Sequence, residues 1–461
     1  MMTALFQALP SPLENNPGWQ QINQKLNANM QMTIVPYADY GAKFATTVAG
    51  GDLPEMIYVP FPYIPQLPDF LKAQCQDLTP FLSGDAVKEY PNLANIPSIS
   101  WRISVFDQGI WGVAIALPVF FWVMWVHQDM IDPLGGELHR DGDDFKRMLK
   151  EVTRPDQGQF GLITQGGYNY AWDVTNGLWP SMFNAPNIWK EEQGAFTRDW
   201  ETEEYEAAVG FARDVYATGA YDPNSPTYNV LSARTAFQQR RSAFRFDGLT
   251  TVTFDSGAKL DPPSQLRLAV PFPAQAGGTP SYFFGPGSFS FMALRKNADS
   301  ERIKELLRLL NYFAAPFGSE EYLNVRYGVR GVEFEFDPKG NPILTEKGVA
   351  DAMPWGAPTG TPVANPPAVL FNPNSEEYPK VIQPAELAMH KVGKSNPAVG
   401  RWSPTDAEKG TVLWQRMGDG IAEIVTGRRP IADFAGMVDE WRKEGGDQIR
   451  AEFEKDFAAS N

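Results

Sequence analysis

The sequence predicts an α/β protein with two lobes. Its 461 residues exceed the ~250–300 residues at which a single hydrophobic core stops growing, so we expect two cores. Along the first sixty residues, short apolar runs alternate with helical patterns, and the Gly50-Gly51 pair supplies a tight turn before the third run. In order, these segments are 3–9, 16–26, 31–35, 39–48 and 52–59. Strand, helix and strand in this order are typical of βαβ units.

Later segments continue the same alternation. Helices are expected at 64–73, 85–90, 144–151, 170–178, 203–218, 231–240 and 299–313, and strands at 242–247 and 266–273. In the helix at 299–313, Ile303, Leu306 and Leu310 recur at core-facing spacing. Ser300 is the expected cap of that helix.

Composition excludes several classes of function. A formal net charge of −15 leaves no general basic surface for nucleic acid and disfavours an acidic ligand, although a local basic patch could override the second point. Cys75 is the only cysteine, so the chain can form no internal disulfide and no thiolate metal site. The three histidines, His127, His139 and His390, are widely separated and are expected at the surface or in loops.

No membrane-spanning segment is expected, because no apolar run reaches ~18 residues. The nearest candidate, 113–126, is short and contains Pro118, which indicates buried strands instead. The N-terminus carries no basic region, apolar signal core or lipobox cysteine. We infer that a leader has been lost, so that any membrane attachment would come only through a lost lipid anchor.

Catalytic motifs are missing from the sequence. Adjacent acids such as Asp143 and Asp144 suit a solvated helix start better than acid–base chemistry, because neighbouring residues of a helix point in different directions. No G-x-S-x-G, P-loop or G-x-G-x-x-G pattern follows a predicted strand. We therefore expect no enzyme.

Several segments resemble one protein family. Residues 45–59, ATTVAGGDLPEMIYV, are similar to the "A..GG.LPD" signature of extracellular solute-binding proteins of ABC importers. Residues 109–135 resemble the passage in which such chains first cross between lobes, and residues 284–295 resemble the return crossing. Residues 317–348 and 426–450 resemble the large family-1 members of the LipO and alginate-binding type.

The resemblance implies a type II periplasmic-binding-protein fold with extra C-terminal helices. The N-terminal lobe would comprise 1–118 and about 285–330, and the C-terminal lobe about 125–280 and about 340–461. The hinge would lie near 117–124 and 280–290, where Leu117-Pro118 restricts the chain to extended conformations.

The resemblance also implies a function. An extracytoplasmic solute-binding protein captures a carbohydrate, here an oligosaccharide, between its lobes and delivers it to the permease subunits of an ABC importer after hinge closure. The alternatives are a glycan-acting enzyme and a surface sensor or adhesin on the same scaffold. We expect a monomer located outside the cell, on its surface or in the periplasm.

We expect neither cofactor nor metal. Alginate-binding relatives carry a calcium loop of alternating Asp and Asn, whereas residues 153–160 here read TRPDQGQF. Because a hard cation needs oxygen ligands at every second position of such a loop, calcium is not carried over.

A sugar site needs aromatic faces for the apolar side of pyranose rings and planar polar groups for their hydroxyls. Position in the predicted elements and the resemblance indicate ten candidate residues. These are Asp39, Tyr40, Phe61, Trp172, Asp173, Trp179, Asp247, Phe284, Phe289 and Trp355. For several of them a structural role remains open: Asp39 could cap a helix, Phe61 could cover the core, and Trp172 or Trp179 could be core residues.

Overall fold

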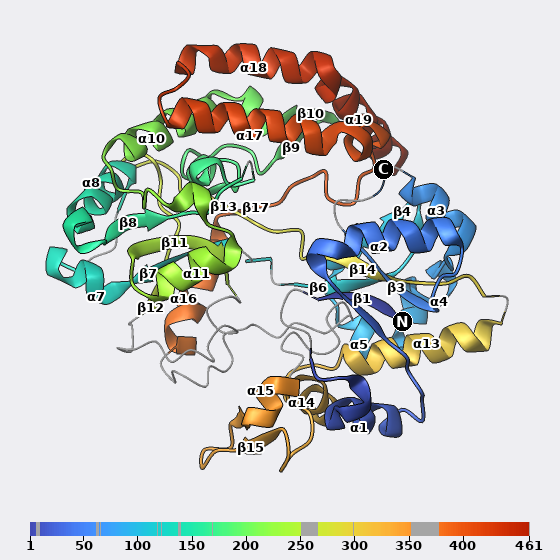
Figure 1. The fold of residues 1–461 in the computed structure, drawn as a ribbon. Helices are drawn as coiled ribbons and strands as arrows, with labels where there is room; N and C mark the ends of the chain where they lie inside the picture. Colours follow the sequence, from blue (N-terminus) through green and yellow to red (C-terminus); the bar gives the residue numbers. More distant parts are fainter. Residues whose placement is uncertain are drawn as a thin grey trace. The chain divides into compact units, whose positions relative to one another are not determined.

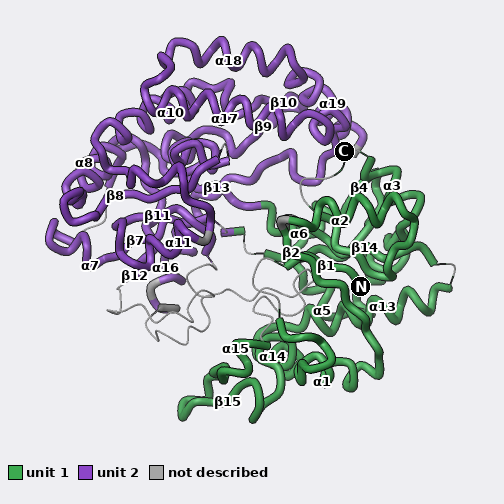
Figure 2. The backbone as a smooth tube through the Cα atoms, viewed as in Figure 1, with its two compact units in different colours: residues 1–119, 286–373 green, residues 120–285, 374–461 purple. Residues whose placement is uncertain are grey.

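The chain divides into two compact units in a computed structural model, which describes residues 1–461 except 6–9, 61–63, 65, 118, 121, 137–139, 168, 250–265, 298, 352–377 and 461. Unit 1 comprises Met1–Val119 and Pro286–Pro373, and unit 2 comprises Phe120–Gly285 and Asn374–Asn461 (Figure 2). Residues 340–351 therefore fall in unit 1, which differs from the lobe boundary expected from the sequence.

Unit 1 is built on a five-stranded sheet in the order β2-β1-β3-β14-β6 (Figure 1). Its strands are β1 (Met2–Leu5), β2 (Thr33–Pro36), β3 (Met56–Val59), β6 (Val113–Ala116) and β14 (Ser288–Leu294). The first three strands are parallel, and β14 runs antiparallel to both β3 and β6. The alternation predicted for the first sixty residues is therefore confirmed.

The helices predicted at 16–26, 39–48, 64–73 and 299–313 are present in unit 1, whereas the segment predicted at 85–90 forms a 3-10 helix, Gly84–Glu89. The α-helices of unit 1 are α1 (Pro17–Lys25), α2 (Tyr37–Gly50), α3 (Leu67–Gln74), α4 (Thr79–Leu82), α5 (Pro91–Ala94), α6 (Ser98–Trp101), α13 (Ser300–Phe313), α14 (Glu320–Tyr327) and α15 (Glu346–Asp351). Helix α2 is capped at its C-terminus by Gly51, whose φ of 70° suits a residue without Cβ. The expected cap of α13 is wrong by one residue, because the Asp299 carboxylate accepts the Glu301 amide at 3.0 Å.

Unit 2 contains a four-stranded sheet in the order β12-β7-β11-β8. Its strands are β7 (Trp122–His127), β8 (Phe160–Ile163), β11 (Ser242–Gly248) and β12 (Leu266–Ala269). Strand β7 is antiparallel to β11 and β12, whereas β8 and β11 are parallel. His127, expected in a loop or at the surface, is completely buried in β7, and burial lowers its pKa to about 4.

The helices of unit 2 are α7 (Gln128–Ile131), α8 (Gly142–Val152), α9 (Leu178–Met182), α10 (Glu203–Ala217), α11 (Val230–Gln238), α16 (Tyr378–Lys391), α17 (Thr411–Val425), α18 (Phe434–Trp441) and α19 (Asp447–Ser460). Two short pairs complete the unit: β9 (Trp189–Glu192) with β10 (Ala195–Arg198), and β13 (Tyr282–Phe283) with β17 (Gly393–Lys394). The helix predicted at 170–178 is wrong, because Ala171, Trp172 and Asp173 adopt positive φ angles and α9 begins only at Leu178. No described helix of the chain is long and apolar enough to cross a bilayer.

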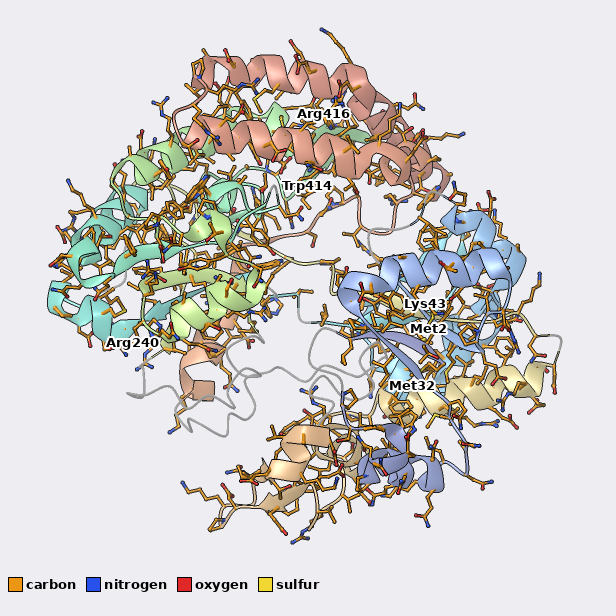
Figure 3. The ribbon with its side chains drawn as sticks, viewed as in Figure 1. Met2, Met32, Lys43, Arg240, Trp414 and Arg416 are labelled. Atoms are coloured by element: carbon orange, nitrogen blue, oxygen red, sulfur yellow. The ribbon has the colours of Figure 1, made fainter. Side chains whose placement is uncertain are left out.

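Arg198 ties the β9–β10 hairpin to the C-terminal helices. Its guanidinium carbon lies 3.9 Å from the ring centre of Trp200 and 5.0 Å from that of Trp414, a residue of α17 labelled with its neighbour Arg416 in Figure 3. The same side chain pairs with buried Asp199 at 3.0 Å. A buried cation flanked by indole faces and one carboxylate is a costly group to disturb.

Replacement of Arg198 by Met should therefore lower the free energy of unfolding by ~3–5 kcal/mol, since Asp199 would remain buried without its partner. Urea unfolding at neutral pH measures this loss. The control is Arg416→Ala, which removes an exposed partner of Glu444 and should cost less than ~1 kcal/mol. Equal stability of the two variants would contradict the assigned role of Arg198.

Candidate ligand-binding site

Three aromatic side chains gather at one edge of the unit 2 sheet. Trp122, the first residue of β7, pairs in register with Gly248, the last residue of β11. Its ring stacks on Phe246 with centroids 6.1 Å apart and planes at 25°, and meets Tyr170 edge-on at 6.3 Å. All three side chains are partly exposed. We call Trp122, Tyr170 and Phe246 the aromatic cluster; it offers the kind of apolar face on which a ring can stack.

A polar cluster, composed of Gln165, Arg234, Arg245 and Asp247, lies at the same edge. Arg245 Nε donates to Asp247 Oδ2 at 2.8 Å, and Arg245 Nη2 donates to Gln165 Oε1 at 3.4 Å. Arg234 Nε donates to Asp247 Oδ2 at 3.0 Å. Burial alone would raise the pKa of Asp247, but the two guanidinium groups hold this pKa below its usual value. The Asp247 carboxylate is therefore ionised.

Tyr170 joins the two clusters. Its hydroxyl hydrogen-bonds to Gln165, and burial together with the charge of Asp247 raises the Tyr170 pKa to about 12, against the opposing effect of Arg245. The phenol is therefore a neutral hydrogen-bonding group at any physiological pH.

A left-handed turn follows Tyr170 directly. Ala171, Trp172 and Asp173 have φ angles of 30°, 58° and 66°, a conformation that costs each residue with a Cβ free energy. The Trp172 carbonyl accepts hydrogen bonds from Trp179 Nε1 at 2.7 Å and from the Tyr221 hydroxyl at 2.8 Å. These buried hydrogen bonds stabilise the turn, and the turn fixes the position of Tyr170.

Asp173 anchors the same turn through its carboxylate. Its Oδ1 accepts from Thr164 Oγ1 at 2.9 Å and from Asn176 Nδ2 at 2.7 Å, and its Oδ2 accepts from the Tyr221 hydroxyl at 3.2 Å. Complete burial outweighs these bonds and raises the Asp173 pKa to about 6.

The predicted residues of unit 2 fall into different places. Asp247 belongs to the polar cluster, and Asp173 supports it from the turn. Trp179 is completely buried and Trp172 is 8% exposed, and both belong to the core of the unit, which favours the core alternative for these two indoles. Phe284 packs on Phe120 at 5.9 Å, in a group separate from the aromatic cluster.

In unit 1, Tyr40 is completely buried and its hydroxyl donates to the Tyr58 carbonyl at 2.7 Å, so it packs within the sheet. Asp39 is exposed in the first turn of α2, whose cap position is occupied by Pro36. Phe61 and Trp355 lie outside the described residues, as does the side chain of Phe289.

Most residues of the two clusters were not predicted from the sequence. Trp122, Tyr170, Phe246, Gln165, Arg234 and Arg245 were not among the candidates. The available signal was positional: Phe246 and Asp247 end a strand, and Trp122 begins the strand that follows the first crossing. In an α/β sheet, ligands bind outside such strand ends.

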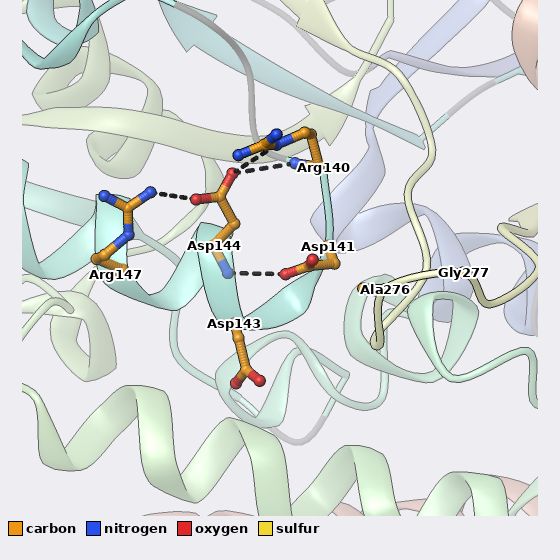
Figure 4. Close-up of a pocket in the computed structure, with 7 residues that line it drawn as sticks. All are labelled: Arg140, Asp141, Asp143, Asp144, Arg147, Ala276 and Gly277. Carbon is orange, nitrogen blue, oxygen red and sulfur yellow. Dashed lines mark hydrogen bonds and ion pairs between the residues drawn. The ribbon is translucent and has the colours of Figure 1, made fainter.

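Two surface pockets lie elsewhere. The first, of about 470 Å³, is lined by Arg140, Asp141, Asp143, Asp144, Arg147, Ala276 and Gly277. In Figure 4, Asp141 caps the first turn of α8 and Asp144 is paired with both arginines, so these side chains satisfy one another. The second, of about 460 Å³, adjoins the amino ends of β1 and β3 in unit 1. Within the described residues, no group of three or more His, Cys, Asp or Glu side chains could hold a metal ion.

Comparisons with known proteins agree with this architecture. The chain is 22% identical over 453 residues to the polygalacturonan/rhamnogalacturonan-binding protein YtcQ of Bacillus subtilis, covering 95% of the chain and 87% of that protein. It is 20% identical over 479 residues to the B. subtilis lipoprotein LipO, covering 98% and 90%. No protein-family model matches the chain.

Among solved structures, the fold is similar to an HMO-binding, ABC-transporter-associated solute-binding protein from Bifidobacterium longum infantis. The TM-score is 0.71 at 12% identity, and the match covers 98% of this chain and 97% of the other. The fold is therefore that of the two-lobe solute-binding proteins. The resemblance to the family-1 solute-binding proteins, and to LipO in particular, is confirmed.

Asp173→Asn should change how stability depends on pH. Because the Asp173 pKa of about 6 in the folded state exceeds the usual Asp value of 3.8, its stabilising contribution is complete below pH ~4 and is lost as the pH rises through 6. This loss amounts to ~3 kcal/mol, which the variant would not suffer.

Urea unfolding of both proteins at pH 4 and pH 7 tests this expectation. Asp199, whose pKa burial also raises to about 6, titrates in both proteins and cancels in their difference. From pH 4 to pH 7, the free energy of unfolding of Asp173→Asn should rise by ~2–3 kcal/mol relative to that of the parent. Parallel pH profiles would show that Asp173 does not titrate as a buried acid.

Proposed function

We propose that the protein is an extracytoplasmic solute-binding protein that captures an oligosaccharide and delivers it to an ABC importer. The observation that carries the proposal is the aromatic cluster, which adjoins a polar cluster of two guanidinium groups, a carboxylate and an amide. A pyranose has an apolar C–H face and an edge of hydroxyl groups, and these two clusters match both. The names of the similar proteins, which refer to polygalacturonan, rhamnogalacturonan and HMO, support the same class of ligand.

Binding is favoured over catalysis by the state of the acids. Asp247 is ionised and held by Arg234 and Arg245, so it cannot donate a proton. Asp173 is buried with both oxygens engaged. We therefore propose a binding protein and not a glycan-acting enzyme.

We also propose that the two units close by rotation about the crossing segments. On the unit 2 side, the Phe284 carbonyl accepts from Asn187 Nδ2 at 2.8 Å. On the unit 1 side, the Gly287 carbonyl accepts from the Leu117 amide and from Ser100 Oγ, each at 2.7 Å. Both anchors are internal to their own unit, so Gly285-Pro286, which lies between them, is a point at which backbone rotation costs little.

The partner would be the permease subunits of an importer, and the place of action the outer side of the membrane. The similarity to a lipoprotein supports attachment there.

Trp122→Ala should weaken oligosaccharide binding at least tenfold, since the stacked ring contributes both area and ~0.5–1.5 kcal/mol of aromatic contact. Calorimetric titration of the folded variant, with a ligand found by a thermal-shift screen of oligosaccharides, measures the loss.

The matched control is Trp414→Ala, which removes a partly buried Trp of the same unit that packs on Arg198. This variant should melt at a lower temperature yet bind normally. If both variants lost affinity equally, the aromatic cluster would not be the sugar platform.

Ligand should also reduce the radius of gyration, because closure brings the two units together. Small-angle scattering with saturating oligosaccharide provides the measurement. The Trp122→Ala variant, at a ligand concentration too low for it to bind the oligosaccharide, should give the scattering profile of the unliganded protein. An unchanged profile of the saturated parent would rule out hinge closure.

A further inference from the structure

Arg245 has hydrogen-bond donors that the described protein leaves unused. The residue is 2% exposed, its Nε and Nη2 are engaged by Asp247 and Gln165, and its Nη1 is buried without a hydrogen-bond partner among the described residues. A charged donor removed from water without an acceptor is destabilising, and such groups are rare in folded proteins. The site therefore lacks an acceptor at Nη1.

Neither nearby carboxylate accepts a hydrogen bond from Nη1. Both oxygens of Asp247 are already engaged: Oδ1 accepts from the Gly248 amide at 2.7 Å and from Arg234 Nη2 at 3.3 Å, and Oδ2 accepts from the Nε atoms of both arginines. Asp173, which lies within electrostatic range of Arg245, has its oxygens engaged by Thr164, Asn176 and Tyr221.

The unused donors belong to the proposed ligand site. Arg245 bonds to Gln165, Gln165 bonds to Tyr170, and the Tyr170 ring contacts Trp122. Polar and aromatic groups thus form one continuous chain of contacts at the carboxyl ends of β8 and β11. Phe246 lies on the face of β11 opposite to Arg245 and Asp247, so a sugar stacked on the aromatic cluster would reach the guanidinium groups past the carboxyl end of the strand, where Tyr170 and Gln165 lie.

We propose that the ligand is an acidic oligosaccharide, and that a uronic acid carboxylate binds at Arg245 Nη1 with support from Arg234. This inference rests on the proposed function and specifies its substrate class. A planar guanidinium pairs with a carboxylate through charge-assisted bonds that are stronger than bonds to a neutral hydroxyl. The net charge of −15 repels acidic ligands in general, so a local pair of arginines is the feature that such a ligand requires.

The experiment compares each oligosaccharide with its own neutral form. Tri-uronates of galacturonate, mannuronate, guluronate and glucuronate are titrated calorimetrically beside their carboxyl-reduced counterparts, which differ only in the acidic group. We expect at least one tri-uronate to bind, reduction of its carboxyl groups to weaken binding at least tenfold, and the affinity for the acidic form to fall as salt rises.

Variants assign the effect to the arginines. Arg245→Gln should bind the acidic and reduced forms within threefold of each other, and Arg234→Gln should lose part of the preference. Arg147→Gln, which removes an exposed charge from α8 of the same unit, should keep the full preference. If Arg245→Gln does not fold, the comparison of acidic and reduced ligands on the parent protein still tests the acidic substrate class. The Arg234→Gln variant, which changes a partly exposed residue, then tests the role of the arginines.

The outcomes separate the two proposals. Equal or tighter binding of the reduced forms, or binding of neutral glycans alone, would overturn the acidic substrate class and leave the sugar-binding function standing. An acidic preference that survives Arg245→Gln would overturn the role of Arg245. Failure of every acidic and neutral oligosaccharide to bind would overturn the proposed function itself.

Discussion

The left-handed turn at Ala171, Trp172 and Asp173 is the constraint on which the candidate site depends. Three consecutive residues with positive φ cost roughly 1–3 kcal/mol each, so the turn persists only because its surroundings determine it. The Trp172 carbonyl accepts two buried hydrogen bonds and the Asp173 carboxylate accepts three. The turn places Tyr170 between an indole and an amide, and without it the aromatic and polar clusters would be separate.

Two buried aspartates of this region show how neighbours decide the state of a carboxyl group. Asp173 has only neutral hydrogen-bond donors on its oxygens, and burial raises its pKa to about 6. Asp247 is equally buried, yet Arg245 and Arg234 bond to it directly and its pKa is lowered. One carboxyl group therefore serves the backbone turn, whereas the other holds two guanidinium groups in place.

The sequence predicted the alternation of strands and helices because apolar periodicity and turn residues are local signals, whereas the two lobes were predicted from the chain length and from the resemblance to solute-binding proteins. It could not predict the site to the same degree. Trp122 and Phe246 are distant in sequence and meet only because β7 pairs antiparallel with β11 in one particular register. Ala-Trp-Asp-Val contains no Gly or Asn, the residues that most often adopt positive φ, so the local sequence did not indicate a left-handed turn. Trp179 was a candidate because its segment contains Gly177 and Pro180, but Pro and Gly in a sequence indicate a turn and not the exposure of the side chains near it.

The location of the site also limits what it can do in the proposed mechanism. Both clusters are built wholly from residues of unit 2, so a ligand makes the same contacts with them whether the units are apart or together. Such contacts provide affinity, but a ligand shifts a conformational equilibrium only through contacts that differ between the two states. The free energy that favours closure must therefore come from contacts with unit 1. There, Tyr37 is 38% exposed and Asp39 is exposed, both in the first turn of α2, where the carboxyl end of β2 leads into the helix. In the proposed mechanism, unit 2 would select the ligand and unit 1 would sense that it is bound.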